Sequence, residues 1–171
     1  MAAKIQQRNE VVNKQCVEVQ VNLAVDCFKS CILKGQGVGA IYGDLAMLRQ
    51  SGDSDVWVPN GMSESMVWIA KNYGEVRYDY INAHVPMYAD TEVELHWRCQ
   101  SMNNLFLNSR LQHLLDTQHE ALTTSKILLN NGQTIIVPTD EFNLFYILLH
   151  AFNHMFSEGL GLRQLMDYYS F

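Results

Sequence analysis

The stretch SGDSDVWV, residues 51–58, places two aspartates directly before an apolar run. Val56-Trp57-Val58 is typical of a buried strand, and the turn residues Pro59-Asn60-Gly61 follow it. In an extended chain, residues two apart point to the same face, so we expect Asp53 and Asp55 to project together. Two carboxylates this close repel each other unless a cation lies between them. The stretch therefore predicts either a metal site at the start of a strand or an ordinary solvated turn.

A glycine-rich stretch precedes these acids. Residues 35–40, GQGVGA, follow a short strand predicted at 31–33 and precede a helix predicted at 40–48. They match the G-x-G-x-x-A fingerprint of a Rossmann dinucleotide-binding domain. In that fold the acidic residue ends the second strand, whereas Asp53 and Asp55 come before theirs, which disfavours this interpretation. Backbone N–H groups of such a loop could still hold a phosphate, and a tight structural turn is the alternative.

A third acid lies further along the chain. Glu94 belongs to the run VELHW, residues 93–97, in a strand predicted at 92–97 that forms a hairpin with residues 78–87. If this strand pairs beside the one after Asp55, three carboxylates meet. Three acids suffice to hold two divalent ions, as in phosphoryl displacement, and Mg²⁺ prefers carboxylate and phosphate oxygens. The competing interpretation is that Glu94 and His96 face solvent on an edge strand.

Hydrophobic periodicity predicts the remaining elements. We expect helices at 9–29, 64–72, 103–119, 139–157 and 162–169, and a hairpin of residues 127–129 and 134–137 around the turn 130–132. The fold class is therefore α+β. A mixed β-sheet flanked by helices occupies about 1–100 and a mainly helical part about 101–171, and together they form a single unit of residues 1–171.

Composition narrows the class of protein. The chain is 48% apolar with a net charge of -6, which fits a globular protein and argues against a broad nucleic-acid-binding face. No apolar run approaches the roughly 20 residues of a membrane span. The N-terminus, MAAKIQQRNE, has no signal-peptide core, so we expect a cytoplasmic protein with no membrane partner. The four cysteines form no C-x-x-C pair and are expected to be reduced.

Two polar pairs occur in the second half. His150 and His154 lie one helical turn apart, but the glutamate of a zinc protease motif is absent. We expect them to connect the helical part with the α/β part. Arg163 and Asp167 are also four residues apart and are expected to form an intrahelical or an interdomain pair.

The order of these motifs resembles the nucleotidyltransferase fold of the DNA polymerase β-like superfamily, and more narrowly a family of uncharacterised bacterial nucleotidyltransferases. The resemblance rests on Leu33-Lys34-Gly35, Tyr42, Arg49, Gly52-Asp53-Ser54-Asp55, Val93-Glu94-Leu95-His96, His150, His154, Gly161-Leu162-Arg163 and Asp167. Gln36 departs from the serine or glycine common there, and Ser54 departs from an aliphatic residue. Chains of that family are typically longer, so we expect a C-terminal part to be missing.

The resemblance implies a catalytic metal site. Asp53, Asp55 and Glu94 would bind Mg²⁺ (or Mn²⁺), and Glu94 would help to take a proton from the attacking hydroxyl. Lys34 and Gly35, together with Gln36, would bind the phosphates of the nucleotide. Arg49 would pair with Asp53 or with phosphate, and a purely structural ion pair is the alternative for it.

The implied reaction moves a nucleoside monophosphate from a nucleoside triphosphate to a hydroxyl of a small molecule, a protein or a nucleic-acid end, with release of pyrophosphate. A non-catalytic nucleotide-binding or regulatory member of the same fold is the main alternative. A glycosyltransferase that uses D-x-D to hold a metal and a nucleotide sugar is a weaker one, because Glu94 has no part in its chemistry.

Overall fold

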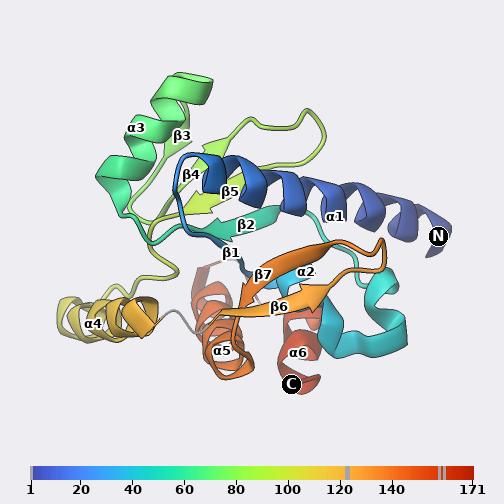
Figure 1. Cartoon of the computed structure of the whole chain (residues 1–171). Helices are drawn as coiled ribbons and strands as arrows, with labels where there is room; N and C mark the ends of the chain where they lie inside the picture. The colour runs from blue at the N-terminus through green and yellow to red at the C-terminus, as the bar shows by residue number, and fades with distance from the viewer. Residues whose placement is uncertain (1, 122–123, 158, 160) are drawn as a thin grey trace.

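A computed structural model of the chain describes residues 2–121, 124–157, 159 and 161–171. Its centre is a five-stranded mixed sheet with the strand order β1-β2-β5-β4-β3 (Figure 1). The strands are β1 Cys31–Ile32, β2 Ser54–Trp57, β3 Arg77–Tyr78, β4 Asn82–Val85 and β5 Val93–His96. The neighbours β2 and β5 run parallel, and the other neighbouring pairs are antiparallel. The predicted mixed sheet is confirmed.

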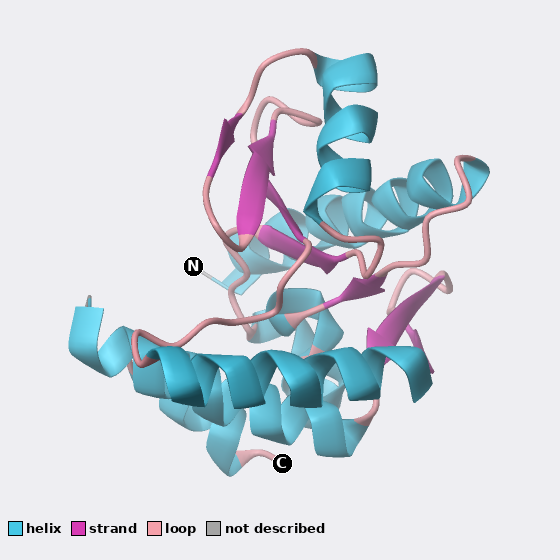
Figure 2. Cartoon of the chain, turned by 90° about the vertical axis from the view of Figure 1, so that its left-hand side faces the viewer, coloured by secondary structure: helices cyan, strands magenta, loops and turns pink. Residues whose placement is uncertain are grey.

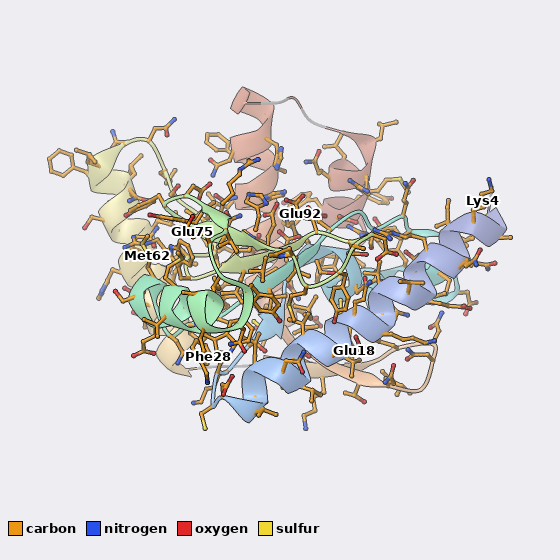
Figure 3. The ribbon with its side chains drawn as sticks, turned by 90° about the horizontal axis from the view of Figure 1, so that it is seen from above. Lys4, Glu18, Phe28, Met62, Glu75 and Glu92 are labelled. Carbon is orange, nitrogen blue, oxygen red and sulfur yellow. The ribbon has the colours of Figure 1, made fainter. Side chains whose placement is uncertain are left out.

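Helices and a second hairpin surround this sheet. The further elements are α1 Ala2–Val25, α2 Lys34–Gly37, the 3₁₀ helix η1 Gly39–Leu48, α3 Met62–Tyr73, α4 Leu105–Ala121, β6 Thr124–Leu128, β7 Thr134–Pro138, α5 Asp140–Ser157 and α6 Leu162–Tyr169. The helices of the second half gather on one side of the sheet, with α3 on the opposite side (Figure 2). Seen from above, α1 crosses one side of the sheet and α5 and α6 lie on the other (Figure 3). Among the described helices, none is both long and apolar enough to cross a membrane.

Strand alternation divides the core in two. One face of the sheet packs against α1 and α3 and is mostly apolar; its members include Val56, Val58, Ala83, Val85, Val93 and Leu95, packed with Val12, Val19, Leu23, Trp68 and Ile69. Its polar member is Ser54 of β2, whose Oγ lies 3.8 Å from Cys16 Sγ of α1. The opposite face carries Trp57 of β2, which stacks on Phe142 of α5 at a ring-centroid distance of 5.2 Å. A second cluster gathers here with α4 and α5. Asp55 of β2 and the polar residues of β4 and β5 share this second face.

Three predicted elements differ in the structure. The helix predicted at 9–29 runs instead over Ala2–Val25, and the chain turns just after it at Cys27, where φ is 64°. The strand predicted at 78–87 is broken into β3 and β4, because the Asp79 side chain accepts hydrogen bonds from the backbone N–H groups of Ile81 and Asn82 and so builds a turn. The helix predicted at 40–48 is a 3₁₀ helix with a kink at Gly43, where φ is 53°. The hairpin predicted after residue 126 is confirmed as β6 and β7, and the last helix has the predicted bounds.

Candidate functional site

The parallel pairing of β2 and β5 brings two acids side by side. In its register Asp55 is opposite Glu94 and Trp57 is opposite His96. Residues two apart on a strand share a face, so His96 joins the two acids. His96 Nε2 lies 3.1 Å from Asp55 Oδ1 and 3.3 Å from Glu94 Oε2. The predicted pairing of Glu94 beside Asp55 is therefore present in the structure.

The turn after β1 positions the side chain of Lys34 next to Asp55. Lys34 Nζ lies 2.8 Å from Asp55 Oδ1. The backbone of Lys34 has a φ of 32°, and that of Gly35 a φ of 42°, a region that side chains rarely adopt. At Gly37 a Cβ atom would lie 2.3 Å from the carbonyl oxygen of Ile32, so only glycine fits. The glycines of this stretch thus allow a tight, strained turn that points Lys34 at the aspartate.

Burial and neighbouring charge set the protonation of the cluster. Burial acts to raise the pKa of Asp55, but the charge of Lys34 and the hydrogen bond from His96 outweigh it and hold the pKa well below its ordinary value. Burial acts to lower the pKa of Lys34 and of His96, and in both cases the contact with Asp55 reverses this and raises the pKa. At Asp53, burial and then the charge of Asp55 raise the pKa. Asp55 is thus a fully ionised carboxylate between two cationic or proton-donating groups.

A second row of polar residues orients Glu94. Asn82 on the neighbouring strand β4 donates a hydrogen bond of 2.8 Å from Nδ2 to Glu94 Oε2. His84 Nδ1 lies 2.5 Å from Glu92 Oε1 and 3.8 Å from Glu94 Oε1. These contacts hold the glutamate from the side that faces away from Asp55.

A pocket opens in front of the cluster, between the α/β part and the helical part. From the α/β part it is lined by Lys34, Gly35, Arg49, Ser51, Gly52, Asp53 and Asp55, and from the helical part by Ile147, His150, His154, Arg163, Gln164 and Asp167. The predicted residues Asp53, Asp55, Lys34, Gly35 and Arg49 are thus brought together at one pocket. Their roles in binding and catalysis stay predictions.

Arg49 forms the structural ion pair that was one of the alternatives for it, with an acid near the other end of the chain. Its guanidinium binds Asp167 of α6 through two hydrogen bonds, from Nε to Oδ1 at 2.7 Å and from Nη2 to Oδ2 at 2.5 Å. Tyr42 donates to the same carboxylate at 2.6 Å. Of the intrahelical and interdomain alternatives expected for Arg163 and Asp167, the structure has interdomain contacts at both residues. Asp167 binds the planar guanidinium of Arg49, which matches both of its oxygens, and Arg163 donates to the carbonyl oxygen of Gln50. The Arg49–Asp167 pair fastens the last helix to the α/β part.

Gln36 is buried behind the loop. Its amide donates to Asn13 Oδ1 and to the main-chain oxygen of Asn9, both on α1, and its Oε1 accepts a hydrogen bond from Ser51. These bonds connect α1, the glycine turn and the residues that precede Asp53. Gln36 therefore supports the loop from within, and its predicted contact with phosphate stays a prediction.

The helical part contributes histidines to the pocket wall, as predicted for a contact between the two parts. His150 and His154 pack edge to face, with ring centroids 4.2 Å apart. Burial and then the charge of Lys34 lower the pKa of His150 to about 3, so this ring is neutral at physiological pH. His96 was expected either to line a cleft, together with His84, or to lie on a strand surface; its position two residues after Glu94 is the signal that places it with the acids.

The donor set suits a divalent cation. One ligand atom each from Asp55, Glu94 and His96 lie within 4.8 Å of one another. Carboxylates are ligands for Mg²⁺ and Mn²⁺, and an imidazole adds a donor that suits manganese better than magnesium. Asp53 lines the adjoining pocket and offers a further carboxylate. The residues present therefore fit a metal-binding site.

Comparisons with known proteins agree with this fold. The sequence profile of a family described as uncharacterised nucleotidyltransferase matches residues 1–171. The crystal structure of an antigenic nucleotidyltransferase-like protein from Paracoccidioides brasiliensis aligns with 97% of this chain and 74% of that one, at a TM-score of 0.50 and 16% sequence identity. At this identity the likeness concerns the fold. Among curated proteins, no sequence matches the chain.

Proposed function

The chain belongs to the family of uncharacterised nucleotidyltransferases, and from this membership we propose that it transfers a nucleoside monophosphate from a nucleoside triphosphate to a hydroxyl acceptor. The observation that carries the proposal is the β2–β5 register, which sets Asp55 beside Glu94 at the edge of a pocket. A cytoplasmic location and Mg²⁺ or Mn²⁺ as the metal belong to the same proposal.

The carboxylates have the first role. Asp55 and Glu94, with Asp53 from the pocket wall, would hold divalent metal, which neutralises phosphate charge and lowers the pKa of a bound hydroxyl. Asp55 is suited to this because its pKa lies well below the ordinary value, so it is ionised at neutral pH. Asn82 fixes the orientation of Glu94 through its hydrogen bond, which limits the rearrangement needed on binding.

The pocket wall has the second role, binding the triphosphate. Lys34 and Arg163 supply positive charge, and the strained turn at Gly35 lets the backbone approach a phosphate closely. Neutral His150 offers a hydrogen-bonding group without adding charge. Arg49 serves the pocket indirectly, because its pair with Asp167 keeps α6, and with it Arg163 and Gln164, against the α/β part.

The reaction then follows from this arrangement. The acceptor oxygen forms a bond to the α-phosphorus, the bond from that phosphorus to the α–β bridging oxygen breaks, and pyrophosphate leaves. The hydroxyl proton passes to a carboxylate, for which Glu94 is the candidate. Positioning and charge neutralisation supply most of the rate enhancement in such reactions.

A non-catalytic nucleotide-binding protein is the second candidate. The observation in its favour is the Lys34–Asp55 ion pair, which neutralises the central carboxylate with a side chain of the protein itself. A site of this kind could bind nucleotide without turning it over.

The test has two stages. Calorimetric titration with Mg²⁺–nucleoside triphosphates measures binding, and incubation of α-³²P-labelled triphosphates with candidate acceptors measures transfer. We expect the double variant Asp53→Asn, Asp55→Asn to lose both. Binding without labelled product or pyrophosphate would favour the second candidate, and unchanged metal–nucleotide binding by the double variant would show that the metal site is wrongly placed.

A further inference from the structure

One carboxylate oxygen of Asp55 is in contact with two side chains at once. Asp55 Oδ1 lies 2.8 Å from Lys34 Nζ and 3.1 Å from His96 Nε2. A carboxylate oxygen has two lone pairs, so these contacts occupy both of them. A metal ion that binds this oxygen must replace one partner, because a cation close to the oxygen would lie against a positively charged ammonium group.

Lys34 is the partner that can leave. His96 belongs to β5 and is held by the sheet, and its side chain is only 5% exposed, whereas that of Lys34 is 20% exposed and lies at the wall of the pocket. The flexible lysine stem joins the backbone at a φ of 32°, a strained conformation of the kind that clusters at functional sites. Moving Lys34 therefore needs no change in the sheet and turns its charge toward the pocket.

We propose that Lys34 is a resident counter-ion of Asp55 that a divalent metal displaces, and that the released ammonium group then binds the phosphates of the nucleotide. The proposal rests on the proposed function, since it assumes that metal and triphosphate bind this site. Lys34 can serve either Asp55 or the phosphates, so it couples the two ligands. Nucleotide draws Lys34 away and strengthens metal binding, and by linkage metal strengthens nucleotide binding by the same factor.

The inference predicts that one substitution, Lys34→Met, changes the affinity for metal and the affinity for nucleotide in opposite directions. In Lys34→Met the competing charge is gone, so Mn²⁺ without nucleotide should bind more tightly, by at least about tenfold, since unit charges a few ångströms apart near a protein surface interact strongly. The same variant should bind a non-hydrolysable triphosphate analogue without metal more weakly. Lys34→Arg keeps the charge and should show no gain in Mn²⁺ affinity. Lys71, which lies 4.0 Å from Asp26 and is exposed, provides the matched control, and Lys71→Met should change neither affinity.

Mn²⁺ affinity is measured by titration calorimetry and by the free-ion signal in electron paramagnetic resonance. Equal or weaker Mn²⁺ binding by Lys34→Met than by the wild type would overturn this inference and leave the proposed function standing. If neither the wild type nor Lys34→Met binds Mn²⁺, both this inference and the proposed function are overturned.

A measurement on the wild type makes the test independent of the folding of Lys34→Met. In protein labelled with ¹³C-lysine, the Cε signal of Lys34, assigned by its loss in Lys34→Arg, should shift as Mg²⁺ saturates the site, while the signal of Lys71 should not. A Lys34 signal that stays in place at saturating Mg²⁺ would mean that the ion pair persists beside the metal, which contradicts displacement.

Discussion

The two faces of the five-stranded sheet are built from the same strands, but they differ in what burial requires. On the face that packs against α1 and α3, the side chains of β2, β4 and β5 are apolar apart from Ser54, whose hydroxyl contacts Cys16 of α1. On the other face, Asp55 is 2% exposed and His96 is 4% exposed, and each of these groups has a named partner. Asp55 and Glu94 are held on this face by contacts with Lys34, His96 and Asn82, so specific contacts, and not depth alone, decide what each face tolerates.

The largest loss of stability is expected when a carboxylate is placed one residue after Asp55, on the apolar face of β2. In Val56→Asp the carboxylate would point at the apolar cluster, where the described residues offer it no cation. An unpaired buried charge costs several kcal/mol, which is comparable to the total stability of about 5–15 kcal/mol of a typical domain. We expect the variant to be largely unfolded by near-ultraviolet circular dichroism. A cooperative unfolding transition as stable as that of the wild type would contradict the contrast between the faces.

The next largest loss of stability is expected when Lys34, the ion-pair partner of Asp55 on the polar face, is removed. Lys34→Met leaves Asp55 without its ammonium group and should lower the free energy of unfolding by about 3–5 kcal/mol at neutral pH, as measured by urea denaturation. The folded-state pKa of Asp55 is depressed, so its pairing stabilises the fold above the unfolded pKa of about 3.9 and is lost as the pH falls toward the folded value. The difference between wild type and variant should therefore narrow below about pH 4. A difference that is constant with pH would show that the lysine acts through packing alone.

A smaller effect is expected at the hydrogen bond that orients Glu94. Asn82→Ala removes a donor to a charged acceptor, and such bonds contribute about 1.5–3 kcal/mol. We expect this loss of stability together with weaker Mn²⁺ binding, whereas Asn72→Ala on α3, which removes a bond to the main-chain oxygen of Trp68, should leave Mn²⁺ binding unchanged. If both variants bind Mn²⁺ like the wild type, Asn82 has no part in organising the site.

The smallest loss of stability is expected from a conservative substitution in the core that packs on the apolar face. Ile69→Val deletes one buried methyl group on α3 and should cost about 0.5–1.5 kcal/mol in unfolding free energy without changing metal or nucleotide affinity. A change in Mn²⁺ affinity here would mean that packing on this face is transmitted through the sheet to the site, which the comparison of the two faces does not predict.

Local pattern was enough to predict much of the polar cluster. Period-two alternation places Glu94 with His96, because neighbouring side chains on a strand always point to opposite faces. It also predicts Asp53 beside Asp55, but Asp53 precedes β2 and lies outside the group of ligand atoms formed by Asp55, Glu94 and His96. The hairpin of β6 and β7 and the bounds of α6 followed from turn residues and helical periodicity in the same way. The resemblance to nucleotidyltransferases named the same acids, and the family match over the whole chain agrees with it.

What the sequence determined by itself was the set of elements and the face on which each side chain lies, since both depend on residues a few positions apart. Only the tertiary structure decided which of these faces meet. It placed Asp55 opposite Glu94 through a parallel pairing, aimed Lys34 at Asp55, and gave Arg49 a partner 118 residues away in Asp167. The physical reason is that strand pairing and buried ion pairs are selected by the packing of the whole chain, and the spacing of residues along a segment carries no record of a partner so far away.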